Sequence, residues 1–307
     1  MGKKKKKISI WDVLRRIVFV VALVVFIVSA WQLYMIFKEY QVGIDEYKDI
    51  RGQILQTVAW DEEGSDVEET TERQNSDSAV AVIYDTDGSG NVFINQGPDV
   101  EDLSDRKGVI INGISIEDLM GVRYNPDFPT LLGMNPEVVG WIKIEDTHIN
   151  YPVVQGSDND KYIRTTLTGQ YNNAGSIFVD YRVESPFESR NTLIHGHNQR
   201  NQQMFHDLVK YKDKEYFDEH PYIMVYTPQG YHLYQIFSCY ETSSTSKSYY
   251  VNLTDDGLYQ SYLDYTVQQS AYDTGLKVDI TDKIITLSTC TNDWKDGRFV
   301  IHAKQIS

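Results

Sequence analysis

One uninterrupted apolar segment near the N-terminus limits what this chain can fold into more than any other feature. Ile17–Phe37, IVFVVALVVFIVSAWQLYMIF, has only Ser29 and Gln32 as clearly polar side chains. As a helix, its 21 residues would span roughly 30 Å, the thickness of a bilayer's hydrocarbon core. The preceding residues 1–16 are strongly basic, and basic flanks stay on the cytoplasmic side. The sequence therefore predicts a cytoplasmic tail at 1–16, a single-pass transmembrane anchor at 17–37 and an extracellular remainder.

A cleaved signal peptide is the alternative interpretation of the same segment. Val28–Ala30, VSA, offers the small residues of a weak cleavage site. The apolar run nevertheless continues to Phe37, whereas the apolar core of a signal peptide is shorter. The length favours an anchor that remains part of the chain.

The composition changes twice after the anchor. Residues 38–60 carry apolar side chains at helical spacing, which predicts a juxtamembrane helix. Residues 61–107 are expected to form an acidic, solvated linker. Within it, Asp61–Ser78 holds eight acidic residues and one basic residue, so this stretch cannot bury enough apolar surface to fold.

Asp85–Gln96, inside this linker, allows two interpretations. Its apolar flanks and Gly-rich centre predict a short hairpin. Asp85, Asp87 and Ser89 also have the spacing of the first ligands of a calcium loop. Gln96, however, stands where that loop needs a bidentate carboxylate. The hairpin is favoured, and calcium binding remains open.

The charge balance excludes one class of partner. The formal net charge is −15 although the N-terminus is basic, so the part beyond the anchor is more acidic still. Such a surface repels the phosphates of nucleic acid. Only two cysteines are present, Cys239 and Cys290, fewer than an exported domain stabilised by disulfides normally carries.

Residues 108–307 are expected to form the main domain, and their pattern is typical of β structure. Short β-branched and aromatic runs alternate with turn residues from Trp141 onward, which predicts an antiparallel barrel or sandwich. Tyr226–His232, YTPQGYH, has the composition of a hairpin turn.

Helices are expected at three places in this domain. Asn135 followed by Pro136 is a helix-start signal. Residues 201–220 and 253–273 predict two helical insertions between strands, the second with Thr254 as its N-cap.

Three side chains of this domain are able to form a nucleophilic site. Cys290 ends an apolar run, and Arg298 opens the next run, so the facing ends of two consecutive strands would place them side by side. A thiol becomes a useful nucleophile when a histidine generates its thiolate, and that histidine later protonates the leaving amine. Arginine keeps its proton and would stabilise a carbonyl oxygen or oxyanion. His197 is the best candidate among seven histidines, because it follows a strand and a glycine in a loop.

Other interpretations of the cysteine remain open from the residues alone. A cysteine that ends an apolar run is more often part of the core. A Cys239–Cys290 disulfide would consume both thiols. His195, His197 and Cys290 also have the ligand types of a zinc site, although no further carboxylate or cysteine cluster supports one.

Several motifs, in order, resemble the class B sortases of Gram-positive bacteria. They are VVGWIKI, INYPVVQGSDNDKYI, NNAGSIFVDYR, GHN with a downstream QMF, TLSTC and GRFVIHAK, and together they cover residues 130–307. The resemblance implies a closed, eight-stranded β-barrel with N-terminal helices and a helix in the loop before the cysteine strand. It also implies a membrane-anchored enzyme without a cofactor or metal.

The resemblance assigns roles to individual positions. It implies that Cys290 is the nucleophile, His197 the general acid and base, and Arg298 the oxyanion and substrate clamp. His195 departs from the pattern, because relatives often have Tyr there. A second set of residues is implied to bind substrate: Asn159, Ile163, His195, Tyr250, Ser288 and Thr289.

The activity implied is that of a thiol transpeptidase. Such an enzyme cleaves a C-terminal sorting signal, here expected to be NPxT-like, after Thr through a thioacyl-enzyme, and transfers the protein to an amine of the cell wall. The implied partners are surface proteins with a sorting signal and a peptidoglycan precursor or pilin amine. The alternatives are a pilin-polymerising sortase, a membrane-tethered cysteine protease that uses water, and a tethered binding module with an inert core cysteine.

Overall fold

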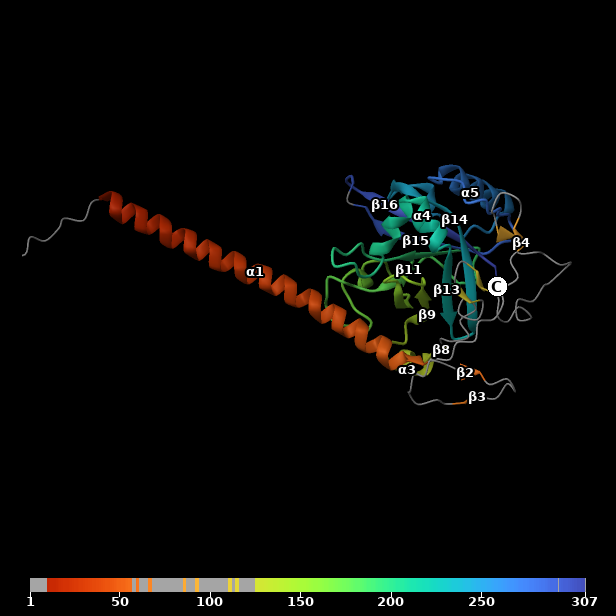
Figure 1. Ribbon diagram of the computed structural model, residues 1–307, viewed down its shortest axis with the longest axis horizontal. Coiled ribbons are helices and arrows are strands. Elements are labelled where there is room, and N and C mark those ends of the chain that lie inside the picture. The colour runs from red at the N-terminus through yellow and green to blue at the C-terminus, as the bar shows by residue number, and fades with distance from the viewer. Residues whose placement is uncertain are drawn as a thin grey trace, which may run out of the picture.

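The computed structural model shows a long helix, α1 (Ile10–Ile54), that leads into a closed β-barrel (Figure 1). It describes residues 10–56, 59–60, 66–67, 85–86, 92–93, 110–111, 114–115, 125–291 and 293–306. Most of the predicted acidic linker, 61–107, lies outside the described residues.

The two halves of helix α1 have different surroundings. From Val13 to Ile54 it is long and apolar enough to cross a membrane, and the side chains described in its N-terminal half are exposed. Near its C-terminus Tyr47, Ile50 and Ile54 are buried against the barrel, and the Tyr47 hydroxyl donates to the Gly175 carbonyl at 2.7 Å. The apolar half indicates a membrane anchor or a signal sequence, and the other half is packed on the barrel.

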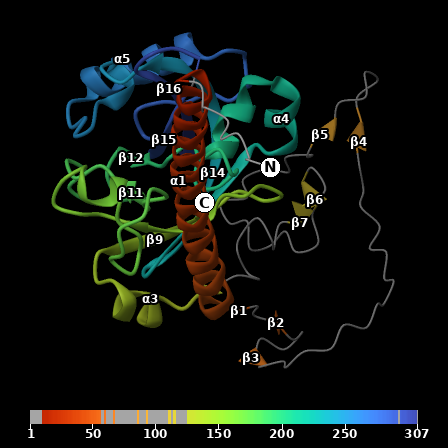
Figure 2. The same ribbon diagram turned by 90° about the vertical axis from the view of Figure 1, so that its left-hand side faces the viewer.

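The end of α1 is tied to a distant part of the chain. β1 (Leu55–Gln56) pairs with β8 (Asn125–Pro126) in antiparallel register, and the Asp127 amide donates to the Ile54 carbonyl at 3.1 Å. Figure 2 shows this end of α1 beside α3 (Phe128–Met134). The chain therefore leaves the barrel after Gln56 and returns to the same place at Asn125.

Among the residues that the structure describes between these two points, three further strand pairs are found. They are β2 (Ala59–Trp60) with β3 (Asp66–Val67), β4 (Asp85–Thr86) with β5 (Val92–Phe93), and β6 (Ile110–Ile111) with β7 (Ile114–Ser115). The β4–β5 pair lies within the segment for which a short hairpin is predicted. The side chains of the alternative calcium loop lie outside the described residues.

The barrel closes in the order β10-β11-β12-β15-β16-β14-β13-β9. In chain order its strands are β9 (Val138–Lys143), β10 (Asn150–Val154), β11 (Ile177–Val179), β12 (Asn191–His195), β13 (Tyr222–Thr227), β14 (Gly230–Ser243), β15 (Ile284–Cys290) and β16 (Gly297–Gln305). The predicted hairpin at Tyr226–His232 joins β13 to β14.

The closed, eight-stranded barrel that the resemblance implies is confirmed, but it is mixed, so the antiparallel arrangement expected from the strand pattern was wrong. β10 pairs with β11, and β12 pairs with β15, in parallel register. A parallel pair needs a long crossover between its strands, and local strand patterns carry no information about that crossover. The segment before β11 holds η2 (Lys161–Ile163), and the segment between β12 and β15 holds two further strands and helix α5 (Asp256–Gln269).

Two helix boundaries differ from those expected. Asn135 ends α3 as its C-cap, and the helix begins earlier because the Asp127 side chain accepts from the Thr130 amide at 3.0 Å. Helix α5 is capped by Asp255 and not by Thr254, since the Asp255 carboxylate accepts from the Leu258 amide at 2.9 Å. In both cases an Asp supplies the capping oxygen, which the sequence pattern alone did not assign.

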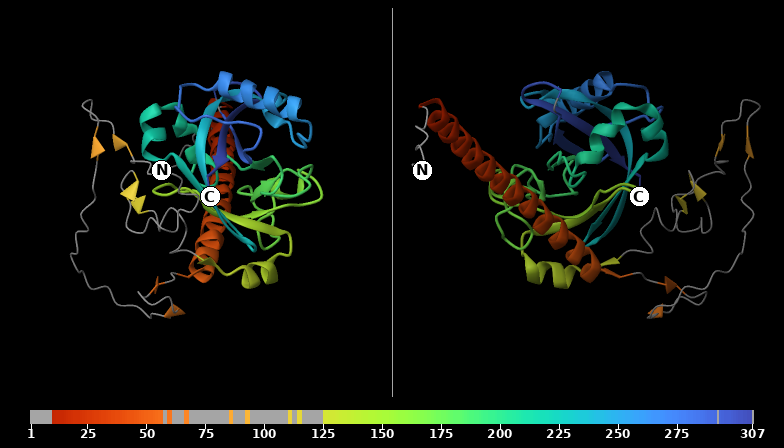
Figure 3. Two further views of the ribbon diagram at one scale, coloured as in Figure 1. Left: turned by 90° about the vertical axis from the view of Figure 1, so that its right-hand side faces the viewer. Right: turned by 60° about the vertical axis from the view of Figure 1, so that its left-hand side comes forward.

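The remaining helical elements of residues 125–306 are short. The predicted insertion at 201–220 folds as η3 (His206–Lys212) followed by α4 (Lys214–Glu219), and η4 (Lys247–Tyr249) precedes α5. α5 and α3 lie on opposite sides of the barrel (Figure 3).

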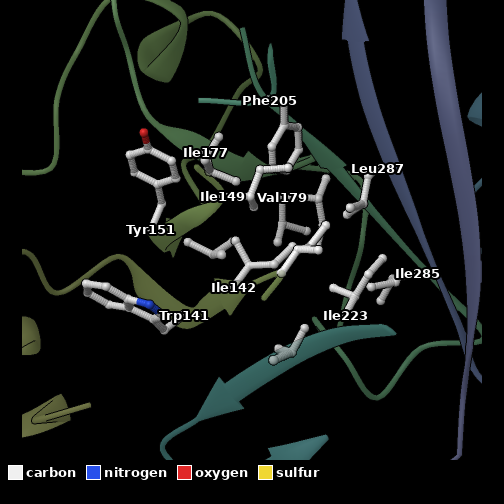
Figure 4. Close-up of a cluster of buried hydrophobic side chains, with 14 of the residues drawn as sticks. Trp141, Ile142, Ile149, Tyr151, Ile177, Val179, Phe205, Ile223, Ile285 and Leu287 are labelled. Carbon is white, nitrogen blue, oxygen red and sulfur yellow. The ribbon is translucent and has the colours of Figure 1, made fainter. Parts of the chain in front are cut away.

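The barrel core fixes which way the side chains of β15 point. Ile142, Ile177 and Phe205 pack with Ile285 and Leu287 in the buried cluster (Figure 4). Because side chains alternate along a strand, Ser288 and Cys290 lie on the opposite face from these two apolar residues.

Gly196 is required by close packing between this core and the loop that follows β12. A Cβ atom there would lie 2.5 Å from Ile177 Cδ1 and 2.6 Å from Phe205 Cδ2. We expect Gly196→Ala to lower the free energy of unfolding by about 1–3 kcal/mol, because well-packed interiors resist added atoms. Urea unfolding of the detergent-solubilised protein measures the change.

Gly133→Ala in α3 is the matched control, because a Cβ atom there has no neighbour within 4 Å. That variant should be neutral or slightly stabilising, since alanine favours a helix over glycine. Equal stability of both variants would contradict the packing argument.

Candidate active site

Cys290 and Arg298 are direct partners across an antiparallel strand pair. Cys290 is the last residue of β15 and is exposed, whereas Arg298 is half-buried near the start of β16. The turn between them closes tightly: a Cβ atom at Gly297 would lie 2.5 Å from Thr291 Cγ2. Since paired residues of antiparallel strands project to the same face, the thiol and the guanidinium share one side of the sheet.

His197 reaches the same face from β12. β12 ends at His195, which pairs with Ser288 of β15, and the Gly196 amide continues this ladder by donating to the Ser288 carbonyl at 3.1 Å. His197 Nε2 lies 2.7 Å from the Ile163 carbonyl oxygen. Because a carbonyl oxygen only accepts, Nε2 carries a proton and Nδ1 is the basic nitrogen of the neutral ring.

Asn198 connects the histidine loop to the cysteine strand. Its Nδ2 donates to the Cys290 carbonyl at 2.9 Å, and its Oδ1 lies 2.7 Å from His206 Nδ1. The Asn198 side chain therefore links the loop that carries His197 both to the end of β15 and to the start of η3.

The three candidate side chains line one open groove of about 500 Å³. Cys290, His197 and Arg298 lie in its lining together with residues of η4 and of the loops after β10 and β11. A groove of this size fits a short extended peptide. A thiol, an imidazole and a guanidinium therefore all face the space that such a ligand would occupy.

A buried acid lies in the wall of the groove. Asp180, directly after β11, has only 1% of its surface exposed. Burial opposes its ionisation, but hydrogen bonds from Arg182, His195 and Asn159 outweigh burial and hold its pKa well below the usual range. Asp180 is therefore a carboxylate at all physiological pH values.

The residues expected to bind substrate fall into two groups. Asn159, Ile163, His195 and Tyr250 line the groove. Ser288 is buried below it, and its hydroxyl lies 2.7 Å from the Tyr249 hydroxyl.

Thr289 is not brought to the groove. It pairs with Phe299, faces the barrel core and is 2% exposed. The reason is the alternation of β15, which turns Thr289 away from the face that carries Cys290.

Sequence reasoning missed several residues of the site. Asp180, Arg182 and Tyr249 line the groove, and Asn198 supports it. The motif FVDYR carried a usable signal, because an acid and a base directly follow an apolar strand there. The sequence pattern gave no reason to choose Tyr249 over its neighbour Tyr250 as a groove residue, because two adjacent tyrosines look the same in it.

Within the described part of the chain, the cysteines and the two histidines have the following partners. Both cysteines are free. His195 Nε2 lies 3.2 Å from Asp180 Oδ2, whereas His197 Nε2 is directed at the Ile163 carbonyl, so the two rings engage different partners.

The two thiols should differ strongly in reactivity. Cys239 is buried, and burial raises the pKa of its thiol to about 11, so it stays protonated and shielded at pH 8. We expect iodoacetamide at pH 8 to modify Cys290 and to leave Cys239 intact. Peptide mass mapping after alkylation checks this.

Cys290→Ala should then take up no reagent in the folded protein. Labelling of Cys239 at a rate similar to that of Cys290 would contradict the assignment of an accessible and a buried thiol.

Comparisons with known proteins place this geometry in a family. The sortase domain family matches residues 142–306. Sortase B of Listeria monocytogenes is 37% identical over 211 residues, which cover 67% of this chain and 84% of that protein.

Solved structures agree in fold. A Clostridium perfringens sortase B structure is 31% identical with a TM-score of 0.57, and the match covers 59% of this chain and 100% of that one. A Staphylococcus aureus sortase B-substrate complex is 33% identical with a TM-score of 0.55 over 59% of this chain and 84% of that one. The chain therefore belongs to the sortase B family of cysteine transpeptidases.

Proposed function

We propose that this transpeptidase cleaves a C-terminal, NPxT-like sorting signal after Thr and transfers the surface protein to an amine of the cell wall. The observation that carries the proposal is the single groove lined by Cys290, His197 and Arg298. The Staphylococcus aureus relative was solved as a substrate complex, which supports a substrate-binding role for the matching groove of this chain.

The first half-reaction forms a thioester. His197 Nδ1 takes the proton of the Cys290 thiol, and the sulfur attacks the carbonyl carbon of Thr. The carbonyl oxygen becomes an oxyanion that the Arg298 guanidinium stabilises. His197 donates a proton to the leaving amine as the C–N bond breaks. The C-terminal fragment departs, and the acyl group remains on sulfur.

The second half-reaction resolves the thioester. An acceptor amine attacks the same carbonyl carbon, His197 takes a proton from that amine, and the thiolate leaves. The choice between amine and water then depends on which nucleophile reaches the groove.

The groove residues supply recognition in this proposal. Asn159, Ile163, His195 and Tyr250 contact the sorting signal along the groove. Ser288 acts from below by fixing the Tyr249 hydroxyl, whose pKa is raised to about 12 by burial, so it remains a neutral hydrogen-bonding group.

Location follows from the charge asymmetry of the N-terminus. The basic residues 1–16 remain cytoplasmic and 17–37 span the membrane, so the barrel lies outside the cell, where the cell wall and secreted substrates are. The juxtamembrane segment 38–60, which is helical only as far as Ile54, the linker 61–107 and the catalytic domain 108–307 complete the proposed organisation.

Cys290→Ala should lower cleavage of an NPxT-type peptide by about 10³-fold or more, because the thioester can no longer form. Cys239→Ala should retain activity, since Cys239 is buried in the core away from the groove. Fluorescence of a quenched peptide measures both rates.

Product analysis separates transfer from hydrolysis in the same assay. With an added amine, mass spectrometry should find the peptide joined to that amine. Hydrolysed peptide alone, across several amines including peptidoglycan stem peptides, would favour the protease, and joining only to a pilin lysine would favour pilus assembly.

Arg298→Lys should reduce kcat by about 10²-fold, because an ammonium cannot reproduce the planar guanidinium beside the oxyanion. Arg190→Lys is the matched control: Arg190 is half-buried, pairs with Asp256 and does not line the groove. Near-normal kcat in Arg298→Lys would exclude the clamp role.

A further inference from the structure

The Asp180 carboxylate collects hydrogen bonds from three separate segments. Arg182 donates from Nε to Oδ1 and from Nη2 to Oδ2, each at 2.8 Å, and from its backbone amide to Oδ1 at 3.0 Å. Asn159 Nδ2 donates to Oδ2 at 2.9 Å, and His195 Nε2 lies 3.2 Å from the same oxygen. One buried acid thus links the loop after β10, the loop after β11 and the end of β12.

The negative charge of Asp180 determines which atoms of its partners donate hydrogen bonds and which accept them. A carboxylate only accepts, so His195 must carry its proton on Nε2, and Nδ1 of the neutral ring is then an acceptor. The same logic orients Asn159: its Nδ2 donates to Asp180, and its Oδ1 accepts from the Tyr181 amide at 3.0 Å. The second N–H of Asn159 is left for another acceptor.

The network extends to the opposite wall of the groove. Arg182 Nη2 also donates to the Tyr249 carbonyl at 3.3 Å, and the His195 ring is parallel to the Tyr249 ring within 4°. Asp180, Asn159, His195 and Tyr249 all line the groove that contains Cys290.

We propose that Asp180 is a positioning residue for transpeptidation. Its carboxylate presets Asn159 as a hydrogen-bond donor and His195 as an acceptor toward the backbone of the sorting-signal peptide. This inference rests on the proposed function of the groove as the peptide site. An extended peptide offers a carbonyl and an amide at each residue, so a wall with one donor and one acceptor matches it.

Asp207 provides a matched comparison within the chain. It is also a buried acid, at 0% exposure, and its pKa is also lowered. Its partners are His148, whose amide and Nδ1 both lie 2.8 Å from Oδ2, and Lys210 at 2.9 Å. It does not line the groove. Both acids stabilise loops, but only Asp180 organises groove residues.

The test compares Asp180→Asn with Asp207→Asn in the full-length protein, using a Cys290-dependent peptide cleavage assay. In Asp180→Asn, the new amide NH2 group faces the N–H donors of its former partners. Asn159 and His195 then lose the hydrogen bonds that orient them. We expect KM for the peptide to rise about tenfold, the effect of losing a hydrogen bond to a charged group. We expect kcat and the rate of Cys290 alkylation to stay within about twofold, and Asp207→Asn to leave all three unchanged.

A double-mutant cycle with His195→Phe reports whether Asp180 acts through the ring. The phenyl ring keeps the stacking but cannot donate, so the two substitutions should raise KM together by less than the product of their separate effects. If Asp180→Asn does not fold, His195→Phe alone must still raise KM, and a wild-type KM there overturns the proposal.

Other outcomes also decide the matter. An unchanged KM in Asp180→Asn, or equal losses of kcat and alkylation in both acid variants, would show a purely structural role. If the wild-type protein shows no Cys290-dependent cleavage, the proposed function itself is refuted. That outcome is distinct from an unchanged KM in Asp180→Asn, which refutes only the role of Asp180.

Discussion

The register of β15 against its two neighbours is the constraint on which the site depends. Antiparallel pairing with β16 sets Cys290 opposite Arg298, and parallel pairing with β12 sets Ser288 opposite His195. A slip of one residue would turn the thiol into the barrel core and expose Leu287. The apolar alternation of β15 prevents that slip, so the same residues that stabilise the barrel also align the chemistry.

The outer face of the barrel is held by a buried polar layer beneath α5. Thr286 donates to Asn191 at 2.8 Å and lies 2.9 Å from His302 Nδ1, whose ring in turn contacts the Tyr240 hydroxyl at 3.1 Å. Burial lowers the pKa of His302 to about 3, so this ring is neutral and structural. Asn191 Nδ2 also donates to the Tyr250 carbonyl at 3.0 Å, which connects the layer to the wall of the groove. Polar groups that are satisfied in this way define one arrangement of the core.

Much of this architecture was accessible from the sequence, for physical reasons. Strand alternation and turn residues predicted the β domain, and the position of Cys290 and Arg298 at facing strand ends predicted their pairing. The parallel pairs were not predictable locally, because they depend on crossovers far along the chain. The burial of Thr289 follows from strand alternation once the core face is known. Asp180 was missed because its importance comes from partners at positions 159, 182 and 195, which only the fold brings together.

The pairing of β1 with β8 changes the meaning of the acidic segment between them. Its two ends are neighbours, since Gln56 lies opposite Asn125. Because both ends of this segment are held on the barrel, its contour length would not set the distance between the barrel and the lipid surface in the proposed membrane topology. In that topology the distance would be set by the length of α1 beyond the apolar stretch, at roughly 1.5 Å per residue. The acidic segment could therefore change in length at only a small cost in loop-closure entropy, and the distance of the groove from the membrane would stay the same.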